Sequence, residues 1–115
     1  INSTLTPTLV DNLIFTITME GFLVVIDRRQ GNIIRITDIF KQFKKKKRSK
    51  IKPVGFIVGS KNIYLTTDHG RLMIIDIVSG RTKSILKIDN DKISRPFVLN
   101  QNLYIIKENS IIRLN

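Results

Sequence analysis

The sequence predicts an all-β protein assembled from repeated antiparallel hairpins. Hydrophobic residues make up 42 % of the 115 residues, isoleucine is the commonest apolar residue and alanine is absent, a balance that favours strands over helices. Short apolar runs alternate with turn signals built from Gly, Asp and Asn. The same hairpin pattern also occurs three times, and no helical periodicity of any length interrupts it.

The clearest copy of this pattern spans residues 62–80. A run rich in β-branched and aromatic residues leads into the turn Asp68-His69-Gly70, and a second apolar run ends at another turn signal. Related copies begin at Asn12 and Asn102, so the three starting asparagines lie 50 and then 40 residues apart. A repeat of roughly 40 residues made of short strands is typical of a β-propeller blade. A six-residue spacing recurs in each copy, from Gly21 to Asp27, from Gly70 to Asp76 and from Asn109 to Asn115.

The first unit, residues 7–38, contains four strand patterns bounded by turn signals. The run 22–26 is continuously apolar, as expected for a strand that is buried on both faces. The four strands are predicted at 8–10, 13–18, 22–27 and 32–37.

The second unit, residues 53–89, repeats the four-strand pattern, whereas the third unit, residues 95–115, contains three strands. The predicted strands are 55–59, 63–67, 72–76 and 82–88, followed by 97–99, 103–107 and 110–114. We therefore predict a single partial β-propeller domain over residues 1–115, with about three consecutive four-stranded antiparallel blades of which the last lacks its outer strand. A chain that stops one strand short is what the C-terminal portion of a larger propeller would look like.

Uncovered blades have a further consequence for the isolated chain. Open flanks leave apolar faces and an unpaired strand edge exposed. We therefore expect the chain to form homo-oligomers when expressed alone, and three copies would provide about eight blades, close to a full ring.

A basic insertion, residues 39–52, separates the first two units. The net charge is +11, and eight of the twenty basic residues lie within 41–52, where there is no acid. We predict an exposed loop over 38–52 with room for one helical turn. A dense cationic loop can bind an anionic polymer or a membrane surface, and the alternative is a solvated insertion without a binding role. The candidate contacts with an anionic partner are Lys44, Lys45, Lys46, Lys47 and Arg48.

Nucleic acid is not expected as a partner of this insertion, and any membrane contact would be peripheral. Only Phe40 and Phe43 are close to the lysines, whereas proteins that bind single strands combine cations with several stacking aromatics. No apolar run approaches the ~18 residues of a membrane span.

No catalytic, metal-binding or cofactor-binding residue is predicted. The absence of cysteine excludes disulfides, thiolate nucleophiles and cysteine-type zinc sites, and leaves the redox compartment open. The single histidine, His69, lies in a turn without a pattern of catalytic partners. Asp89-Asn90-Asp91 is interpreted as a polar loop, because a calcium site needs several converging oxygen ligands.

The turns 26–31 and 75–80 resemble the repeat of PQQ-type β-propellers, Ala-Leu-Asp-x-x-Thr-Gly-Lys followed by a tryptophan that docks between blades. The chain keeps the acid and the glycine of that repeat and departs from it at the alanine, the threonine and the docking tryptophan. We interpret the retained residues as structural, because Gly closes a tight turn and Asp accepts backbone N–H groups there. The retained positions are Asp27, Gly31, Asp76 and Gly80; Val25 and Ile74 replace Ala, Gln30 and Ser79 replace Thr, and Arg35 and Ser84 replace Trp.

Within that superfamily the chain is most similar to the BamB-like group, the eight-bladed periplasmic lipoproteins of the outer-membrane β-barrel assembly machinery. The resemblance implies a non-enzymatic scaffold for protein–protein interaction, located in the periplasm and associated with the outer membrane. It also implies that isoleucine packing replaces the docking tryptophans, or that the blade contacts are weaker. No partner-binding residue is carried over. Contact of residues 41–52 with an anionic polymer or membrane is the alternative function, and a degenerate quinoprotein dehydrogenase, a family that holds PQQ and calcium, is the third.

Overall fold

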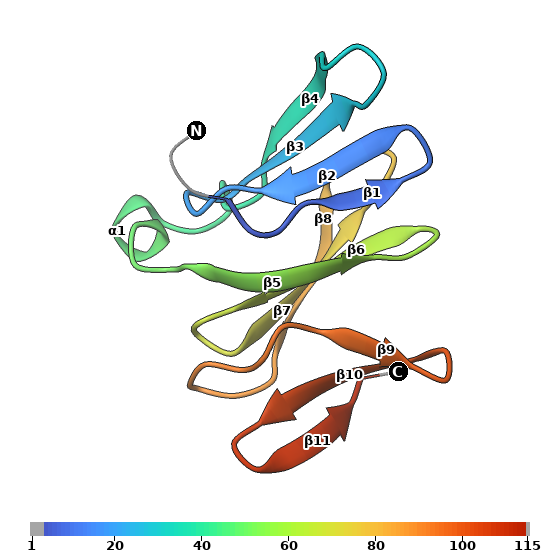
Figure 1. Ribbon diagram of the computed structural model, residues 1–115. Coiled ribbons are helices and arrows are strands. Elements are labelled where there is room, and N and C mark those ends of the chain that lie inside the picture. The colour runs from blue at the N-terminus through green and yellow to red at the C-terminus, as the bar shows by residue number, and fades with distance from the viewer. Residues whose placement is uncertain (1–3, 115) are drawn as a thin grey trace.

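The computed structural model describes residues 4–114, and within them eleven strands form three separate antiparallel sheets (Figure 1). We call the sheets blades 1, 2 and 3. Blade 1 has the strand order β1-β2-β3-β4, blade 2 the order β5-β6-β7-β8, and blade 3 the order β11-β10-β9. The strands of blade 1 are β1 (Thr8–Val10), β2 (Leu13–Ile17), β3 (Phe22–Asp27) and β4 (Ile33–Asp38).

Blades 2 and 3 follow after the one short helix of the described chain, α1 (Lys45–Arg48). The fold-class prediction is confirmed: the described chain is all-β, and blade 3 has three strands where blades 1 and 2 have four. Asn115, which was predicted to end the third repeat, lies outside the described residues. The remaining strands are β5 (Pro53–Val58), β6 (Asn62–Thr67), β7 (Arg71–Asp76), β8 (Thr82–Lys87), β9 (Phe97–Leu99), β10 (Asn102–Lys107) and β11 (Ser110–Arg113).

The observed strands begin and end within two residues of the predicted positions. The largest difference is at β5, which begins at Pro53 rather than at Gly55. Proline is acceptable there because the first residue of a strand need not donate a hydrogen bond to the ladder. Within residues 4–114 no helix is long and apolar enough to cross a bilayer.

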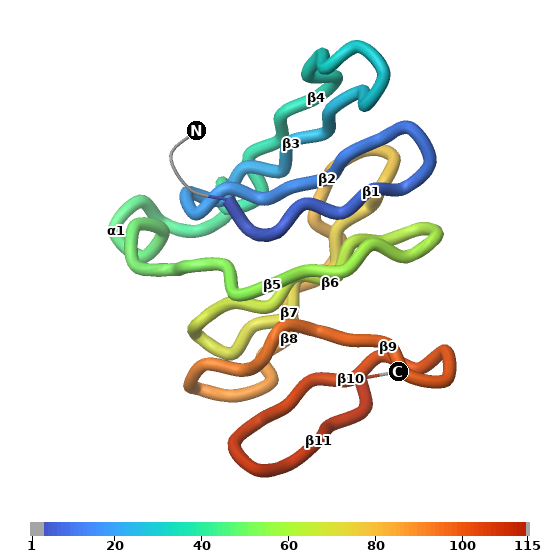
Figure 2. Tube along the Cα trace, viewed as in Figure 1, coloured from blue at the N-terminus to red at the C-terminus, as the bar shows by residue number. Residues whose placement is uncertain are grey.

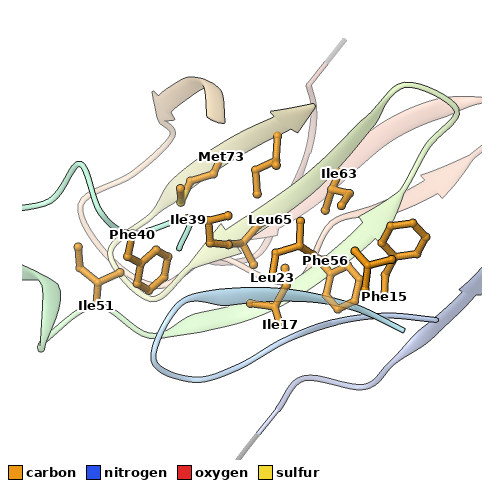
Figure 3. Close-up of a cluster of buried hydrophobic side chains, with 12 residues drawn as sticks. Phe15, Ile17, Leu23, Ile39, Phe40, Ile51, Phe56, Ile63, Leu65 and Met73 are labelled. Atoms are coloured by element: carbon orange, nitrogen blue, oxygen red, sulfur yellow. The ribbon is translucent and has the colours of Figure 1, made fainter. Parts of the chain in front are cut away.

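The three blades lie one after another, with the face of each sheet turned toward the next sheet, as the Cα trace shows (Figure 2). The first strands of blades 1 and 2, β1 and β5, contact each other. The main core lies between these two blades and receives side chains from β2, β3, β5, β6 and β7 (Figure 3). Stacked sheets bury apolar side chains from both facing surfaces, which is the main source of their stability.

The basic insertion contributes three side chains to this core. Ile39, Phe40 and Ile51 are at most 2 % exposed and belong to the cluster between blades 1 and 2 (Figure 3). The prediction of an exposed loop over residues 38–52 is therefore wrong for both ends of the segment, although the predicted helical turn is present as α1. The burial of apolar side chains anchors the two ends, and the lysines between them remain in solvent.

Phe40 is also the reason for a glycine in the β2–β3 turn. Gly21 has a φ of +96°, and a Cβ at this position would overlap the Phe40 ring. The N–H of Ile39 donates to the Gly21 carbonyl over 3.0 Å. The turn and the start of the insertion therefore pack as one unit.

A β-bulge occurs at the equivalent place in blades 1 and 2. The pairing of β3 with β4 shifts between Val25 and Ile26, and that of β7 with β8 shifts between Ile74 and Ile75. In both blades the extra residue is in the outer strand, where a bulge increases the local twist.

Candidate protein-binding surfaces

The two acidic turns share a main-chain hydrogen bond in blades 1 and 2. Asp27 and Asp76 each accept the N–H of the glycine four residues later through their main-chain carbonyl, over 2.8 Å in both turns. The Asp27 carboxylate accepts the Arg29 N–H over 2.9 Å. The side chains are thus used inside their own turns, which is a structural role.

The carboxylate of Asp76 accepts two backbone N–H groups. Ser79 donates over 2.9 Å and Val78 over 2.8 Å, and the Lys83 ammonium is 3.7 Å away. The pKa of Asp76 lies below its ordinary value of 3.8 because these backbone N–H groups stabilise the ionised carboxylate. The Ser79 N–H has the largest effect, the Val78 N–H follows, and the Lys83 ammonium has a smaller one.

This lowered pKa predicts an acid-dependent loss of stability. The ionised Asp76 stabilises the folded state fully above about pH 4, and the contribution is lost as the pH falls through the lowered pKa. Asp76→Asn should therefore flatten the pH dependence of the chemical denaturation midpoint below about pH 4. Asp91→Asn, in an exposed loop, is the matched control. Equal slopes for wild type and Asp76→Asn would contradict this role.

A second recurring turn contact was not predicted from the sequence. The Thr18 hydroxyl accepts the N–H of Phe22 over 3.1 Å, and the Thr67 hydroxyl accepts the N–H of Arg71 over 3.3 Å. Both threonines are buried at the ends of the second strands of their blades. The signal in the sequence is a threonine four residues before the first residue of the next strand.

Arg35 connects blade 1 to blade 2. Its guanidinium donates to the Ile77 carbonyl over 3.0 Å and to the Val78 carbonyl, both in the β7–β8 turn. Arg35 occupies the place of the docking tryptophan in the PQQ-type repeat. The expectation that isoleucine packing would replace this tryptophan is therefore wrong at Arg35, because a charged donor supplies two hydrogen bonds instead. A weaker contact between the blades stays a prediction.

The glycines of the two acidic turns differ in their surroundings. Gly80 has a φ of +75°, and a Cβ there would lie 2.7 Å from the Thr37 hydroxyl oxygen of blade 1. Gly31 has a similar φ of +72°, but a Cβ there would meet no atom within 4 Å. The turn of blade 2 is thus packed against a preceding blade, and the turn of blade 1 has no such neighbour among the described residues.

The outward face of blade 1 is apolar and only partly covered in the described chain: Thr16 and Val24 are buried there, and the Thr16 hydroxyl donates to the Leu5 carbonyl. Ile14 and Ile26 pair with each other on this face, and both are partly exposed. Ile36 on β4 is 55 % exposed. The corresponding residues of blade 2, Ile63 and Ile75, are fully buried against blade 1. This surface, the blade 1 flank, therefore has the composition of a blade–blade interface without the neighbouring blade.

The outward face of blade 3 has the same character. Ile106 and Ile111 pair across β10 and β11 and are 44 % and 67 % exposed. Phe97 stacks on Tyr104 with ring centroids 5.7 Å apart, and Leu99 is exposed beside them. We call this surface the blade 3 flank. The described residues thus form a stack whose two ends are both apolar.

The cationic segment separates into two parts. Lys44 and the three lysines of α1 are exposed, and the helix has no acid in its first turn. Arg48 instead contacts residues inside the molecule, because its guanidinium lies 2.6 Å from the Asp38 carboxylate and 5.8 Å from the centre of the Phe22 ring. Of the candidate anion contacts, the four lysines are therefore free to meet a partner, whereas Arg48 neutralises an acid.

A groove of about 650 Å³ lies between the outer strands of blades 1 and 2. Most of its lining residues are polar or basic, and they come from the end of β4, from the start of the insertion, from the β7–β8 turn and from the first part of β8. The lining residues are Thr37, Asp38, Lys41, Gln42, Gly80, Arg81, Thr82, Lys83, Ser84 and Ile85.

The remaining polar candidates are held by local contacts. His69 Nδ1 lies 2.8 Å from the Asp68 carboxylate, and the ring is 43 % exposed in its turn. The Asp89 carboxylate accepts the Asn90 N–H and lies 3.7 Å from the Lys107 ammonium. Among residues 4–114, no group of acids and histidines is arranged as a metal site.

Comparison with known proteins identifies the fold. No family model matches this sequence, and no curated protein sequence is significantly similar to it. Among solved structures, a quinohemoprotein alcohol dehydrogenase from Pseudomonas putida HK5 is 23 % identical over 87 % of this chain, with a TM-score of 0.65. The WD40 β-propeller domain of Doa1 is 13 % identical over 96 %, with a TM-score of 0.66. BamB from Moraxella catarrhalis is 14 % identical over 95 %, with a TM-score of 0.59.

The chain spans 16 %, 35 % and 42 % of the lengths of these three proteins. Together with the three stacked sheets, the likeness shows that the chain is a partial β-propeller. The similar structures include both an alcohol dehydrogenase and propellers of the WD40 and BamB types. The fold is thus shared by enzymes and by non-enzymatic proteins.

Proposed function

We propose that this chain is a non-enzymatic β-propeller segment that holds protein partners, in a role similar to that of the BamB-like component of outer-membrane β-barrel assembly. The observation that carries the proposal is the pair of apolar flanks. Ile63 and Ile75, which are buried in blade 2, have as counterparts in blade 1 the partly exposed Ile14 and Ile26. Exposed apolar surfaces of this kind are typical of interaction sites. The likeness to BamB supports the choice of partner class.

This proposal places the protein in the periplasm, at the outer membrane. Fractionation of the native host should recover the protein with periplasmic and outer-membrane markers. A pull-down from the same fractions should enrich β-barrel assembly components, identified by mass spectrometry. Recovery of the protein in the cytosolic fraction, or failure to enrich any assembly component over a flank variant such as Ile111→Lys, would contradict the proposal.

A second candidate function is binding of an anionic polymer or membrane surface through residues 41–52. The observation that favours it is the exposure of Lys44–Lys47 without a neighbouring acid in α1. Such binding should weaken steeply with salt, because it depends on charge neutralisation and counterion release. Salt-sensitive binding to anionic vesicles or oligonucleotides that is lost when the four lysines are replaced by alanine would support this function over the first.

The flanks also predict the behaviour of the chain when expressed alone. The two flanks provide the surfaces that neighbouring blades bury in the observed stack, so a second copy can cover them. Multi-angle light scattering should give a mass that is a multiple of 13.2 kDa at micromolar concentrations. Ile36→Lys combined with Ile111→Lys should shift the protein toward the monomer. The matched control is Val78→Lys, because Val78 is exposed in a turn outside both flanks. A monodisperse wild-type monomer would contradict the expectation.

A further inference from the structure

We propose that the groove between β4 and β8 binds an acidic polypeptide segment in an extended conformation, which adds to the edge of β8. The inference rests on the proposed function as a holder of protein partners, and it assigns a second contact site and a chemical class to the partner. The groove, of about 650 Å³, is large enough for several residues of an extended chain.

The outer strand of blade 2 has an open edge. β8 is the last strand in its sheet, and residues 83–87 are all exposed. Extended peptides bind such edges through main-chain hydrogen bonds, and alternate side chains of the peptide then meet the groove walls. The groove lies beside the first half of this strand, because Thr82, Lys83, Ser84 and Ile85 all line it.

The charges around the groove favour an acidic peptide. Lys41, Arg81 and Lys83 line it. The only acid among the lining residues, Asp38, is compensated by Arg48 at 2.6 Å. Asp76 lies 3.7 Å from Lys83 but accepts two backbone N–H groups within its own turn. Among the described residues, Lys41 and Arg81 form no ion pair with an acid and can therefore meet carboxylates of a bound segment.

The lining chemistry distinguishes a peptide from the other anionic macromolecules. No aromatic residue lines the groove, whereas binding of single-stranded nucleic acid relies on stacking of bases on aromatic rings. The cations also lie in a recess between two blades, in contrast to the exposed lysines of α1, which project where a flat anionic membrane could reach them. Lysine on an edge strand opposes pairing with other copies of this basic protein and favours an acidic strand.

A direct binding measurement tests the groove. A fluorescein-labelled peptide of about ten alternating glutamate and valine residues, long enough to add a strand, is titrated with the full chain by fluorescence anisotropy. Arg81→Glu should weaken binding about tenfold or more, because an attractive contact becomes repulsive. Lys92→Glu, an exposed lysine outside the groove, should change binding less than about threefold. Circular dichroism establishes that each variant is folded.

The location of binding gives a second readout. In a ¹H–¹⁵N correlation spectrum, the largest peptide-dependent shifts should fall on the amides of residues 82–85. The inference is overturned if Lys46→Glu in α1 weakens peptide binding more than Arg81→Glu does, or if the peptide does not bind. It is also overturned if oligothymidylate or phosphatidylglycerol vesicles bind to the wild-type chain and Arg81→Glu weakens that binding about tenfold or more. If the peptide does not bind but partner proteins are still captured through the flanks, only the groove site is refuted. If the peptide binds through Arg81 but no partner is captured through the flanks, only the proposed function is refuted.

Discussion

Phe40→Ala is expected to lower the free energy of unfolding by about 3–5 kcal/mol, the range for removal of a fully buried aromatic side chain. Phe40 is 0 % exposed and lies in the core between blades 1 and 2. Its ring fills the space left by the missing side chain of Gly21. The change would leave a cavity at the point where the β2–β3 turn, the insertion and blade 2 meet, and denaturant titration followed by circular dichroism measures the loss.

The matched control for Phe40 is its neighbour Phe43. The two rings meet edge to face with centroids 5.6 Å apart, but Phe43 is only partly buried at the rim of the same cluster. Phe43→Ala should cost about 1–2 kcal/mol. If Phe40→Ala prevents folding, Phe40→Leu keeps most of the volume and should cost about 1 kcal/mol. A larger loss for Phe43→Ala than for Phe40→Ala would show that the insertion is not anchored in the core.

Arg35→Ala is expected to lower the free energy of unfolding by about 2–3 kcal/mol, because two charge-assisted hydrogen bonds between blades are lost. The guanidinium binds the carbonyls of Ile77 and Val78, and its Nε is buried without a hydrogen-bond partner, which reduces the net gain. Equilibrium denaturation in urea measures the difference. The loss should appear as a lower midpoint with an unchanged slope, because the fold is retained.

Two variants test whether the Arg35 effect depends on its geometry. Arg35→Lys keeps the charge but lacks the planar fork that reaches both carbonyls, so it should restore less than half of the stability lost in Arg35→Ala. Arg29→Ala removes an exposed arginine side chain from the same blade and should change stability by less than about 0.5 kcal/mol. Equal losses for Arg29→Ala and Arg35→Ala would contradict the inter-blade role of Arg35.

The strands could be predicted because their signals are local. The alternation of apolar runs with Gly, Asp and Asn placed all eleven strands, and their observed ends differ by at most two residues. The burial of Ile39, Phe40 and Ile51 could not be predicted in the same way, since these residues show no period and flank a run of lysines. Their burial depends on the approach of segments that are distant in sequence, including the contact between Phe40 and Gly21.

In the candidate site, too, local features could be predicted from the sequence and contacts between distant segments could not. The lysine run and the acidic turns were visible as composition and spacing, but the position of Arg48 beside Asp38 depends on how the insertion folds back on β4. The inter-blade contact of Arg35 was missed for a different reason. Its acceptors are main-chain carbonyls, which every residue carries, so no residue type in the β7–β8 turn could indicate them.

The Arg35 contact gives the stack a polarity. The outer strand of blade 1 donates to a turn of blade 2, whereas blade 3 has no fourth strand in the described chain, so the two ends of the stack are not equivalent. Copies in which the blade 3 end of one chain meets the blade 1 end of the next join head to tail, which is a heterologous contact. Such joints either close into a ring of fixed size or continue without limit, so a small change in the angle between blades separates a discrete assembly from a filament.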